Sequence, residues 1–198
     1  MRIFKENLVP LPKIQTPDIS IFSKYEKVCL EIGCGVGMHP VKFAMKNKDQ
    51  YFIAIEHTKN KFDKFWNRYL SHKSPDNLLP IHANAISWVT HFIAPESIDK
   101  IFILYPNPNP KKKDLNKRWH AMPFMQKLIQ VLKPNGEIEI ATNMEWYAHE
   151  AIDYLKNDFK MSLINHKTLD KNITNYRTHF ESKYIKSGNV CHNMLFSR

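Results

Sequence analysis

Leu30-Glu31-Ile32-Gly33-Cys34-Gly35-Val36-Gly37 is the segment that most constrains the fold of this chain. An apolar run leads into it, and three glycines at alternate positions end it. A helix-compatible segment with Val41 and Phe43 follows. Glycines let a ligand lie against the backbone, and they tolerate positive φ angles. The segment therefore predicts a strand, a tight loop that binds a ligand, and a helix.

A second strand is predicted over residues 51–56, and it ends in the carboxylate of Glu56. A carboxylate at the end of the second strand can accept both hydroxyls of a ribose. We therefore expect the glycine loop and Glu56 to bind a cofactor that contains a nucleoside.

The glycine spacing narrows the choice of cofactor. A dinucleotide fingerprint has the pattern G-x-G-x-x-G, whose third glycine would fall at Met38. Here the pattern is G-x-G-x-G, and Glu31 precedes it. A carboxylate there repels a pyrophosphate and suits an ammonium group. S-adenosylmethionine has an ammonium, a sulfonium and a ribose but no phosphate, so the residues favour it. A nicotinamide or flavin nucleotide and a purely structural turn are the alternatives.

The length and charge indicate one domain and a polyanionic partner. The chain has 198 residues, a net charge of +10 and a pI near 9.4. We expect a basic N-terminal arm over residues 1–24 and a cofactor-binding domain over residues 25–198. The positive charge favours nucleic acid as the partner over an anionic membrane surface.

The cysteines and the apolar runs indicate a cytoplasmic protein. Cys29, Cys34 and Cys191 are odd in number and lack framework spacing, which implies a reducing compartment. No signal segment or membrane-spanning run is found in the sequence. We interpret Cys34 as a packing residue, and Cys191-His192 lacks further ligand motifs, so we expect no metal site.

Hydrophobic patterning predicts the remaining elements of an α/β fold. One helix has five large residues on a single face, all expected in the core: Phe62, Phe65, Trp66, Tyr69 and Leu70. The other predicted elements are strands over 78–82, 98–105 and 137–142, helices over 122–132 and 145–156, a turn at 134–136, and a final antiparallel pair over 161–166 and 190–196. This alternation predicts a Rossmann-like, mostly parallel sheet with an antiparallel C-terminal strand.

Several polar residues follow predicted strands. Besides the glycine loop these are Glu56, Asn84, Asn107 and Asn143. Ligands of open α/β sheets bind at the carboxyl ends of the strands, so we expect these residues to converge on one edge.

The fourth strand leads into a loop that combines prolines, amides and cations. Prolines at alternate positions keep residues 105–110 extended and stiff, which can hold Asn107 in register against a substrate. The cations expected to contact phosphates are Lys111, Lys112, Lys113, Lys117 and Arg118.

Taken together, these motifs resemble the bacterial tRNA (guanine-N7-)-methyltransferases. The resemblance covers residues 27–196 and includes the glycine loop, the Ile55-Glu56 strand end and the proline–lysine loop over 106–113. It also includes the segment over 141–148 and the late T-x-[FY]-E motif over 178–181. The resemblance implies a class I methyltransferase fold, S-adenosylmethionine as cofactor and tRNA as substrate.

The resemblance also implies residue roles. The implied cofactor-binding residues are Glu31, Gly33, Gly35, Gly37, Glu56, Asn84 and Asn107. Asn107 takes the catalytic position, and the implied substrate-binding residues are Lys111, Asn143, Thr178, His179, Phe180 and Glu181.

This chain departs from the family pattern at three positions. The family usually has aspartate where Asn84, Asn107 and Asn143 stand, so the pocket keeps its shape and loses negative charge. Guanine N7 is a lone pair that carries no proton, so methyl transfer needs alignment and no general base. We expect a weakened or differently selective enzyme. The alternatives are a methyltransferase that acts on another base and a non-catalytic protein that binds RNA and cofactor.

Overall fold

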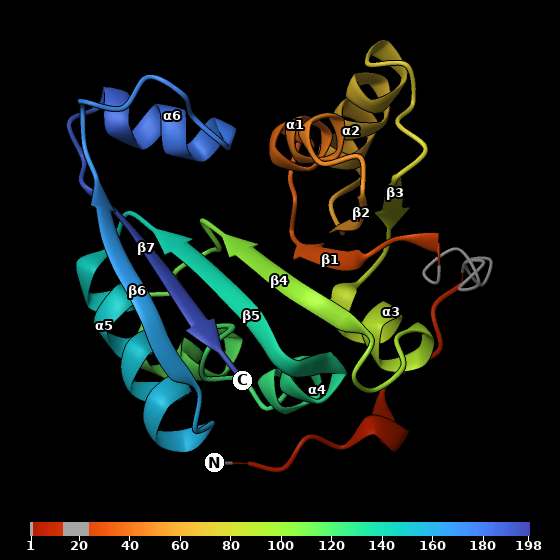
Figure 1. The fold of residues 1–198 in the computed structure, drawn as a ribbon. Helices are drawn as coiled ribbons and strands as arrows, with labels where there is room; N and C mark the ends of the chain where they lie inside the picture. The colour runs from red at the N-terminus through yellow and green to blue at the C-terminus, as the bar shows by residue number, and fades with distance from the viewer. Residues whose placement is uncertain (1, 14–23) are drawn as a thin grey trace.

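The computed structural model describes residues 2–13 and 24–198. Its strands are β1 (Lys27–Ile32), β2 (Gln50–Glu56), β3 (Leu78–His82), β4 (Ile98–Leu104), β5 (Leu132–Thr142), β6 (Ser162–Leu169) and β7 (Cys191–Ser197). They form one seven-stranded sheet with the order β3-β2-β1-β4-β5-β7-β6 (Figure 1). Strands β1 to β5 are parallel, and β7 runs antiparallel to both β5 and β6. The predicted fold class is confirmed.

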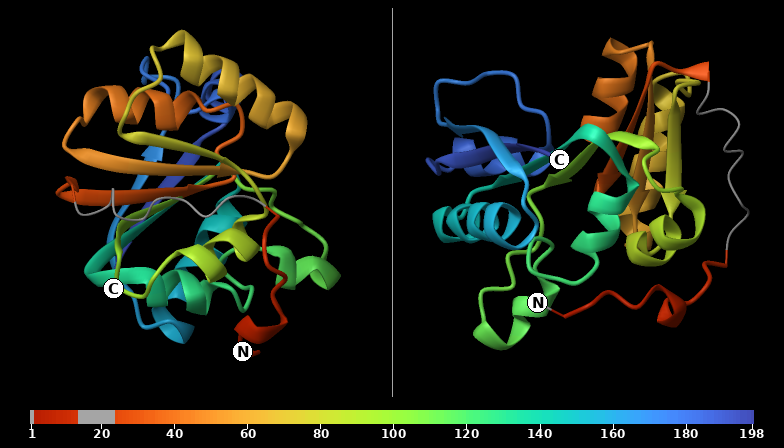
Figure 2. Two further views of the ribbon diagram at one scale, coloured as in Figure 1. Left: turned by 90° about the vertical axis from the view of Figure 1, so that its right-hand side faces the viewer. Right: turned by 60° about the horizontal axis from the view of Figure 1, so that its bottom comes forward.

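Helices cover both faces of the sheet (Figure 2). On one face lie α1 (Met38–Lys46), α2 (Lys59–Ser71) and α6 (His179–Lys186). On the other face lie α3 (Ala85–Phe92), α4 (Met125–Val131) and α5 (Glu145–Asp153), which a π turn over Tyr154–Asp158 extends. Short 3-10 turns occur at Glu6–Leu8 and Lys112–Lys117.

Two apolar clusters, one on each face, fix the sheet between these layers. Ile53, Ile101 and Trp88 belong to the cluster beneath α3, α4 and α5. Phe52 and Phe65 belong to the cluster beneath α1 and α2. Because β1 lies between β2 and β4, the strand order reverses at β1, and this switch point positions the glycine loop.

Gly37 connects the glycine loop to the packing of α2. It adopts φ +73° at the start of α1, a conformation that favours glycine. A β-carbon at this position would lie 1.9 Å from the ring of Phe65. Close packing of α2 on the loop therefore requires a glycine here.

The burial predicted for α2 is only partly correct. Phe65 is fully buried, whereas Trp66 is 42% exposed and Leu70 is exposed as well, so their predicted core positions are wrong. Phe62 and Tyr69 are partly buried. The helix packs on β2 and β3, at the outer edge of the sheet (Figure 1). The sheet there is too narrow to cover the whole apolar face of the helix, so part of that face stays exposed.

Three local structures differ from the sequence-based expectation. Helices α3 and α6 were not predicted from the apolar pattern. The predicted turn at 134–136 lies within β5, where the register shifts between Ile98 and Lys100 of the neighbouring strand. Asn135 adopts φ +64° there, so the turn residues form an irregularity in the strand instead of ending it.

The described part of the predicted N-terminal arm lies along α3 and α4. The Phe4 amide donates to Gln126 at 2.9 Å, and Lys127 pairs with Glu6 at 2.9 Å. Residues 1 and 14–23 of the predicted arm lie outside the described residues. No helix within the described residues has the length and apolar character needed to cross a membrane.

Candidate active site at the carboxyl edge of the sheet

The glycine loop is fixed to β2 by hydrogen bonds. The amides of Gly33 and Cys34 donate to the carbonyl oxygen of Ile55 at 2.8 and 3.1 Å. The Gly35 amide donates to Glu56 Oε2 at 2.8 Å, and the Thr58 amide donates to Glu56 Oε1 at 2.7 Å. Glu56 is only 5% exposed, so this carboxylate organises the loop and still has lone pairs for a ligand.

Two cavities meet at the glycine loop, and Gly33 lines both. The first, of about 250 Å³, lies between the loop and α6 and includes Glu31, His179 and Phe180 in its lining. The second, of about 230 Å³, lies beneath the end of β2 and includes Glu56, Asn84, Ile86 and Trp119.

These residues fit S-adenosylmethionine. A β-carbon at Gly33 or Gly35 would meet no heavy atom within 4 Å, so both glycines leave open space where a ligand can approach the backbone. The second cavity offers apolar walls for a base, with Glu56 beside them for a ribose. The first offers the buried carboxylate of Glu31 for an ammonium group.

Glu31 has a partner that the sequence did not suggest. His39 Nδ1 lies 2.8 Å from Glu31 Oε2, and both side chains are buried. Rings of Phe43, Phe52 and Phe102 surround the imidazole. The pair fixes one oxygen of Glu31 and leaves the other for a ligand.

Asn84 begins α3. Its Oδ1 accepts hydrogen bonds from the amides of Ile86 at 2.9 Å and Ser87 at 3.4 Å, so it is the N-cap residue of the helix. Asn84 also lines the second cavity. Because the oxygen is engaged by the helix, the side-chain NH₂ group is what Asn84 can offer a base.

Cys34 lies between the two glycines without nucleophilic character. Burial raises the pKa of its thiol well above the ordinary value, and the nearby carboxylates of Glu31 and Glu56 act in the same direction. The thiol is therefore protonated at neutral pH, as expected of a packing residue.

The proline loop follows β4 in a constrained conformation. Tyr105 adopts φ +52° and Asn109 adopts φ +46°. Asn107 Oδ1 accepts from the Asn109 amide at 3.2 Å, and Asn109 Nδ2 donates to the carbonyl oxygens of Asn107 and Lys117. Asn107 is exposed, and it lines neither of the two cavities.

Arg118 holds this loop against α5. It is 6% exposed, and its Nη1 donates to both carboxylate oxygens of Glu150, at 2.6 and 2.7 Å. It also donates to the carbonyl oxygens of Asn109 at 3.1 Å and Pro110 at 3.2 Å. We call Arg118, together with Glu150 and the carbonyl groups of Asn109 and Pro110, the Arg118 clamp. The prediction that Arg118 contacts phosphates is therefore wrong, because the loop and Glu150 occupy its donors.

His120 contacts the carboxylate of the Arg118 clamp. Its Nε2 lies 2.7 Å from Glu150 Oε2, and the ring is fully buried against Tyr147. Burial lowers the pKa of His120 although Glu150 favours the charged form. The neutral imidazole therefore donates from Nε2 and helps to orient Glu150.

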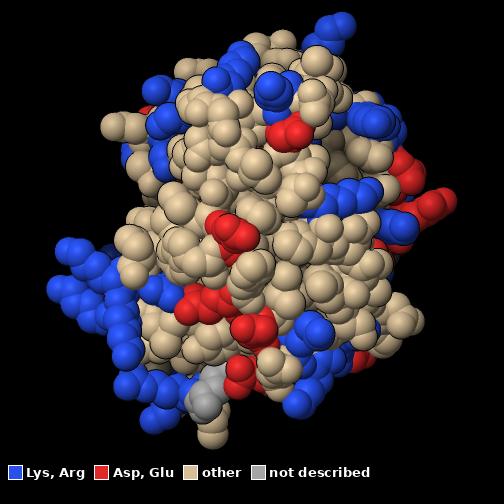
Figure 3. All heavy atoms as spheres, turned by 90° about the vertical axis from the view of Figure 1, so that its left-hand side faces the viewer, with Lys and Arg blue, Asp and Glu red and all other residues tan. Residues whose placement is uncertain are grey.

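The remaining lysines of the loop are available to a polyanion. Lys111, Lys112 and Lys113 are exposed, and none of them forms an ion pair within the described residues. Lys117 pairs with Asp114 at 2.8 Å, but its side chain remains 69% exposed. On the face shown in Figure 3, basic side chains gather at the top and along one lower edge, with acidic side chains between them.

The T-x-[FY]-E motif is a helix start. Thr178 Oγ1 accepts from the Glu181 amide at 2.9 Å and caps α6. Thr178, His179 and Phe180 line the first cavity beside the glycine loop. Glu181 is 1% exposed and accepts from the Tyr105 hydroxyl at 2.8 Å.

Arg177 completes the contacts of Glu181. Its amide and guanidinium both donate to this carboxylate, and the guanidinium also pairs with Glu139 on β5. In this structure the oxygens of Glu181 are thus engaged by protein, and its contact with Tyr105 fixes the start of the proline loop. Glu181 therefore positions the loop from the first turn of α6.

The structure gathers most of the predicted residues at one edge. The glycine loop, Glu31, Glu56, Asn84 and the start of α6 surround the two cavities. Asn107, Lys111 and Asn143 lie on the adjoining loops and line neither cavity. Sequence reasoning missed His39, Glu150 and Arg177, whose partners are distant in the chain and leave no local motif.

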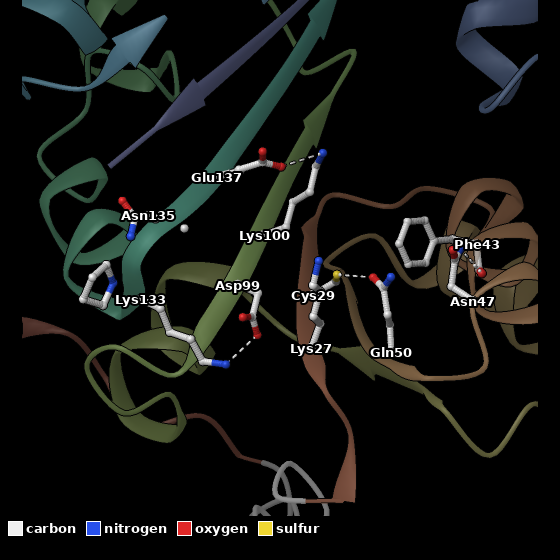
Figure 4. A pocket seen from close by; sticks show the side chains of 12 residues that line it. Lys27, Cys29, Phe43, Asn47, Gln50, Asp99, Lys100, Lys133, Asn135 and Glu137 are labelled. Atoms are coloured by element: carbon white, nitrogen blue, oxygen red, sulfur yellow. Dashed lines mark hydrogen bonds and ion pairs between the residues drawn. The ribbon is translucent and has the colours of Figure 1, made fainter. Parts of the chain in front are cut away.

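A further cavity, of about 410 Å³, lies at the opposite edge of the sheet (Figure 4). Four of its charged side chains form ion pairs, Lys133 with Asp99 at 2.7 Å and Lys100 with Glu137 at 3.1 Å. Burial raises the pKa of Cys29 to about 12. Because these four charges are paired and the cavity lies at the amino ends of the strands, it is not the candidate active site.

Comparison with solved structures places the fold among methyltransferases. The structure of a 16S rRNA methyltransferase, KamB, matches with a TM-score of 0.69 and 16% identity, covering 93% of this chain and 94% of that one. A SAM-dependent methyltransferase from Aquifex aeolicus matches with a TM-score of 0.57 and 12% identity, covering 90% and 86%. These matches confirm the class of fold.

Sequence comparison identifies the family. The family model described as "Putative methyltransferase" matches residues 25–194. The chain is 30% identical to the tRNA (guanine-N(7)-)-methyltransferase of Nitrosomonas eutropha, covering 98% of this chain and 84% of that protein. It is 28% identical to the Mycoplasma pneumoniae protein of the same name, covering 95% and 93%. The chain therefore belongs to the tRNA (guanine-N7-)-methyltransferase family.

Proposed function

We propose that this protein transfers a methyl group from S-adenosylmethionine to N7 of a guanine in tRNA. The main support for the proposal is that the cofactor cavities and the basic loop lie together at the carboxyl ends of the strands. The cofactor cavities at Gly33 adjoin a stiff loop that carries Asn107 and three exposed lysines, which form no ion pair with any residue that the structure describes. A polyanionic substrate could bind the lysines while one of its bases reaches the cofactor.

The protein has to align two reactants and has no proton to remove. When bound, S-adenosylmethionine supplies a methyl group on a positively charged sulfur. Glu31 would hold its ammonium group, and Glu56 would hold its ribose. The glycine loop would let the cofactor lie close to the backbone. Because guanine N7 attacks with an in-plane lone pair, the chain needs no general base, and rate depends on how accurately the base is positioned.

Asn107 is proposed to orient the guanine. Its Oδ1 is directed by the Asn109 amide and can accept one more hydrogen bond, from the N1–H or the amino group of the base. A neutral acceptor binds these donors about half as strongly as a carboxylate. We therefore propose a slower enzyme than an aspartate at position 107 would give.

A second candidate function rests on the same residue. An amide can donate and accept at once, as the edge of adenine requires. Methylation of another base is therefore the alternative, and the product distinguishes the two.

The test is incubation of unmodified tRNA with the protein and methyl-labelled S-adenosylmethionine. The RNA is then digested to nucleosides and analysed by mass spectrometry. We expect label in 7-methylguanosine. Label in a different nucleoside would support the alternative base. Binding of RNA and cofactor without any labelled nucleoside would contradict catalysis.

A further inference from the structure

Trp146 is a large apolar side chain in an unusual place. It lies in the first turn of α5, three residues after Asn143 at the end of β5, and 39% of it is exposed. Its neighbours Tyr147 and Ala148 are fully buried and supply the packing of this helix. Trp146 therefore contributes little to the core, and part of its ring is free to contact a ligand.

One face of the indole is covered by a cation. The guanidinium carbon of Arg118 lies 4.8 Å from the ring centre of Trp146. The guanidinium is itself fixed by Glu150 and by the carbonyl oxygens of Asn109 and Pro110. The indole is thus contacted by the Arg118 clamp on one face and by the ring of Tyr147 edge to face, and its exposed part remains for a ligand.

The same clamp links the indole to the substrate loop. Arg118 contacts the segment that carries Asn107 on one side and Lys111 on the other. An exposed aromatic ring beside unpaired lysines is the combination that binds single-stranded nucleic acid, in which bases stack on rings while cations contact phosphates. Trp146 and Lys111–Lys113 together match that pattern.

We propose that the exposed face of Trp146 stacks on a nucleobase of the RNA next to the methylated guanine. The inference rests on the proposed function. Trp146 lines neither of the two cavities at the glycine loop, where the target base must meet the cofactor. The base on the indole is therefore a neighbour of the target, and the indole sets how the RNA enters the site.

The test is the affinity of unmodified tRNA for Trp146→Ala, measured without cofactor over a series of salt concentrations. We expect the dissociation constant to rise roughly 5- to 150-fold, the range of one base–aromatic stack. The slope of log affinity against log salt should not change, because stacking releases no counterions. Trp146→Phe keeps a stacking ring and should bind within about threefold of wild type.

A second exposed tryptophan serves as the control. Trp66 on α2 is 42% exposed and stacks on Phe62, away from the Arg118 clamp. Trp66→Ala should leave tRNA affinity unchanged. Calorimetry with S-adenosylmethionine should give wild-type affinity for Trp146→Ala, which shows that the variant is folded.

Three results would overturn the inference. Wild-type tRNA affinity in Trp146→Ala would exclude stacking. A flattened salt slope would show that the loss comes from displaced cations. Equal loss in Trp146→Phe would indicate a structural role for the indole.

The outcome is separable from that of the proposed function. If wild type makes 7-methylguanosine while Trp146→Ala binds normally, only the stacking inference fails. If wild type binds tRNA without methylating it and Trp146→Ala binds less well, only the proposed function fails.

Discussion

The two halves of the site are held by different kinds of contact. In the cofactor half, which comprises residues 31–37 and Glu56, the bonds come from the adjacent strand β2. In the substrate half, which comprises residues 105–118 and the start of α5, side chains from distant segments hold the loop. Glu150 and Glu181 lie 32 and 76 residues away from their partners there.

This difference determines how strongly each half of the site responds to substitutions elsewhere in the chain. A loop fixed by its own strands keeps its shape when residues elsewhere change. A loop fixed by distant ion pairs depends on each partner, since removal of one leaves the other buried without compensation. We therefore expect the substrate half to be sensitive to single changes that leave the cofactor half intact.

The largest effect is expected from Arg118→Ala. The change leaves Glu150 and two loop carbonyls without their donor, which should cost about 2–4 kcal/mol of the free energy of unfolding, less than a fully buried pair because part of Glu150 is solvated. A misplaced loop should lower methyl transfer by about 100-fold. Denaturant unfolding and single-turnover methylation are the measurements. Lys117→Ala is the matched control, and an effect of equal size there would refute the clamp.

The next effect concerns the cofactor half. Glu56→Ala removes the acceptor for the Gly35 and Thr58 amides and for the ribose. The binding free energy of S-adenosylmethionine should become about 1–3 kcal/mol less favourable, which is the usual cost of leaving hydrogen-bonding groups without a partner. Calorimetry measures it, with Asp63→Ala on the surface of α2 as the control. Unchanged affinity would remove Glu56 from the site.

A smaller effect is expected from the exposed lysines. Replacement of Lys111, Lys112 and Lys113 by alanine should reduce the slope of log tRNA affinity against log salt by roughly two to three units. Lys46 and Lys48 lie near the amino ends of the strands, on the opposite side of the sheet from the loop. Replacement of these two lysines should leave the slope unchanged. If the far pair alters the slope and the loop lysines do not, RNA binds elsewhere.

The smallest effect is expected at Asn107. Asn107→Asp keeps the acceptor for the Asn109 amide and adds a charge for the guanine edge. Turnover should rise by up to about tenfold, since 1.4 kcal/mol of transition-state stabilisation gives a factor of ten. Single-turnover rates with saturating tRNA measure it. A fall in rate would favour a base other than guanine.

The convergence of the residues in the cofactor half could be predicted from the sequence because its determinants are local. The glycines, Glu31 and Glu56 stand in consecutive elements, and the parallel sheet brings them together. Helix α3 could also have been predicted, because Asn84 is a good N-cap residue before Ile86 and Val89. The same holds for α6, since T-x-x-E is a capping pattern.

The substrate half could not be predicted in the same way. Arg118 has the sequence context of a phosphate-binding cation, and only the fold shows that Glu150 occupies its guanidinium. Trp66 and Leu70 fit a buried helical face, yet α2 packs near the edge of the sheet and leaves them exposed. Pairing over long sequence distances and the extent of a sheet are properties of the tertiary structure.

The independence of the two halves is tested most directly by calorimetric titration of S-adenosylmethionine into Arg118→Ala. We predict a dissociation constant within about twofold of wild type, because the clamp supplies no group to the glycine loop or Glu56. A loss of tenfold or more, in a variant with wild-type circular dichroism, would contradict it.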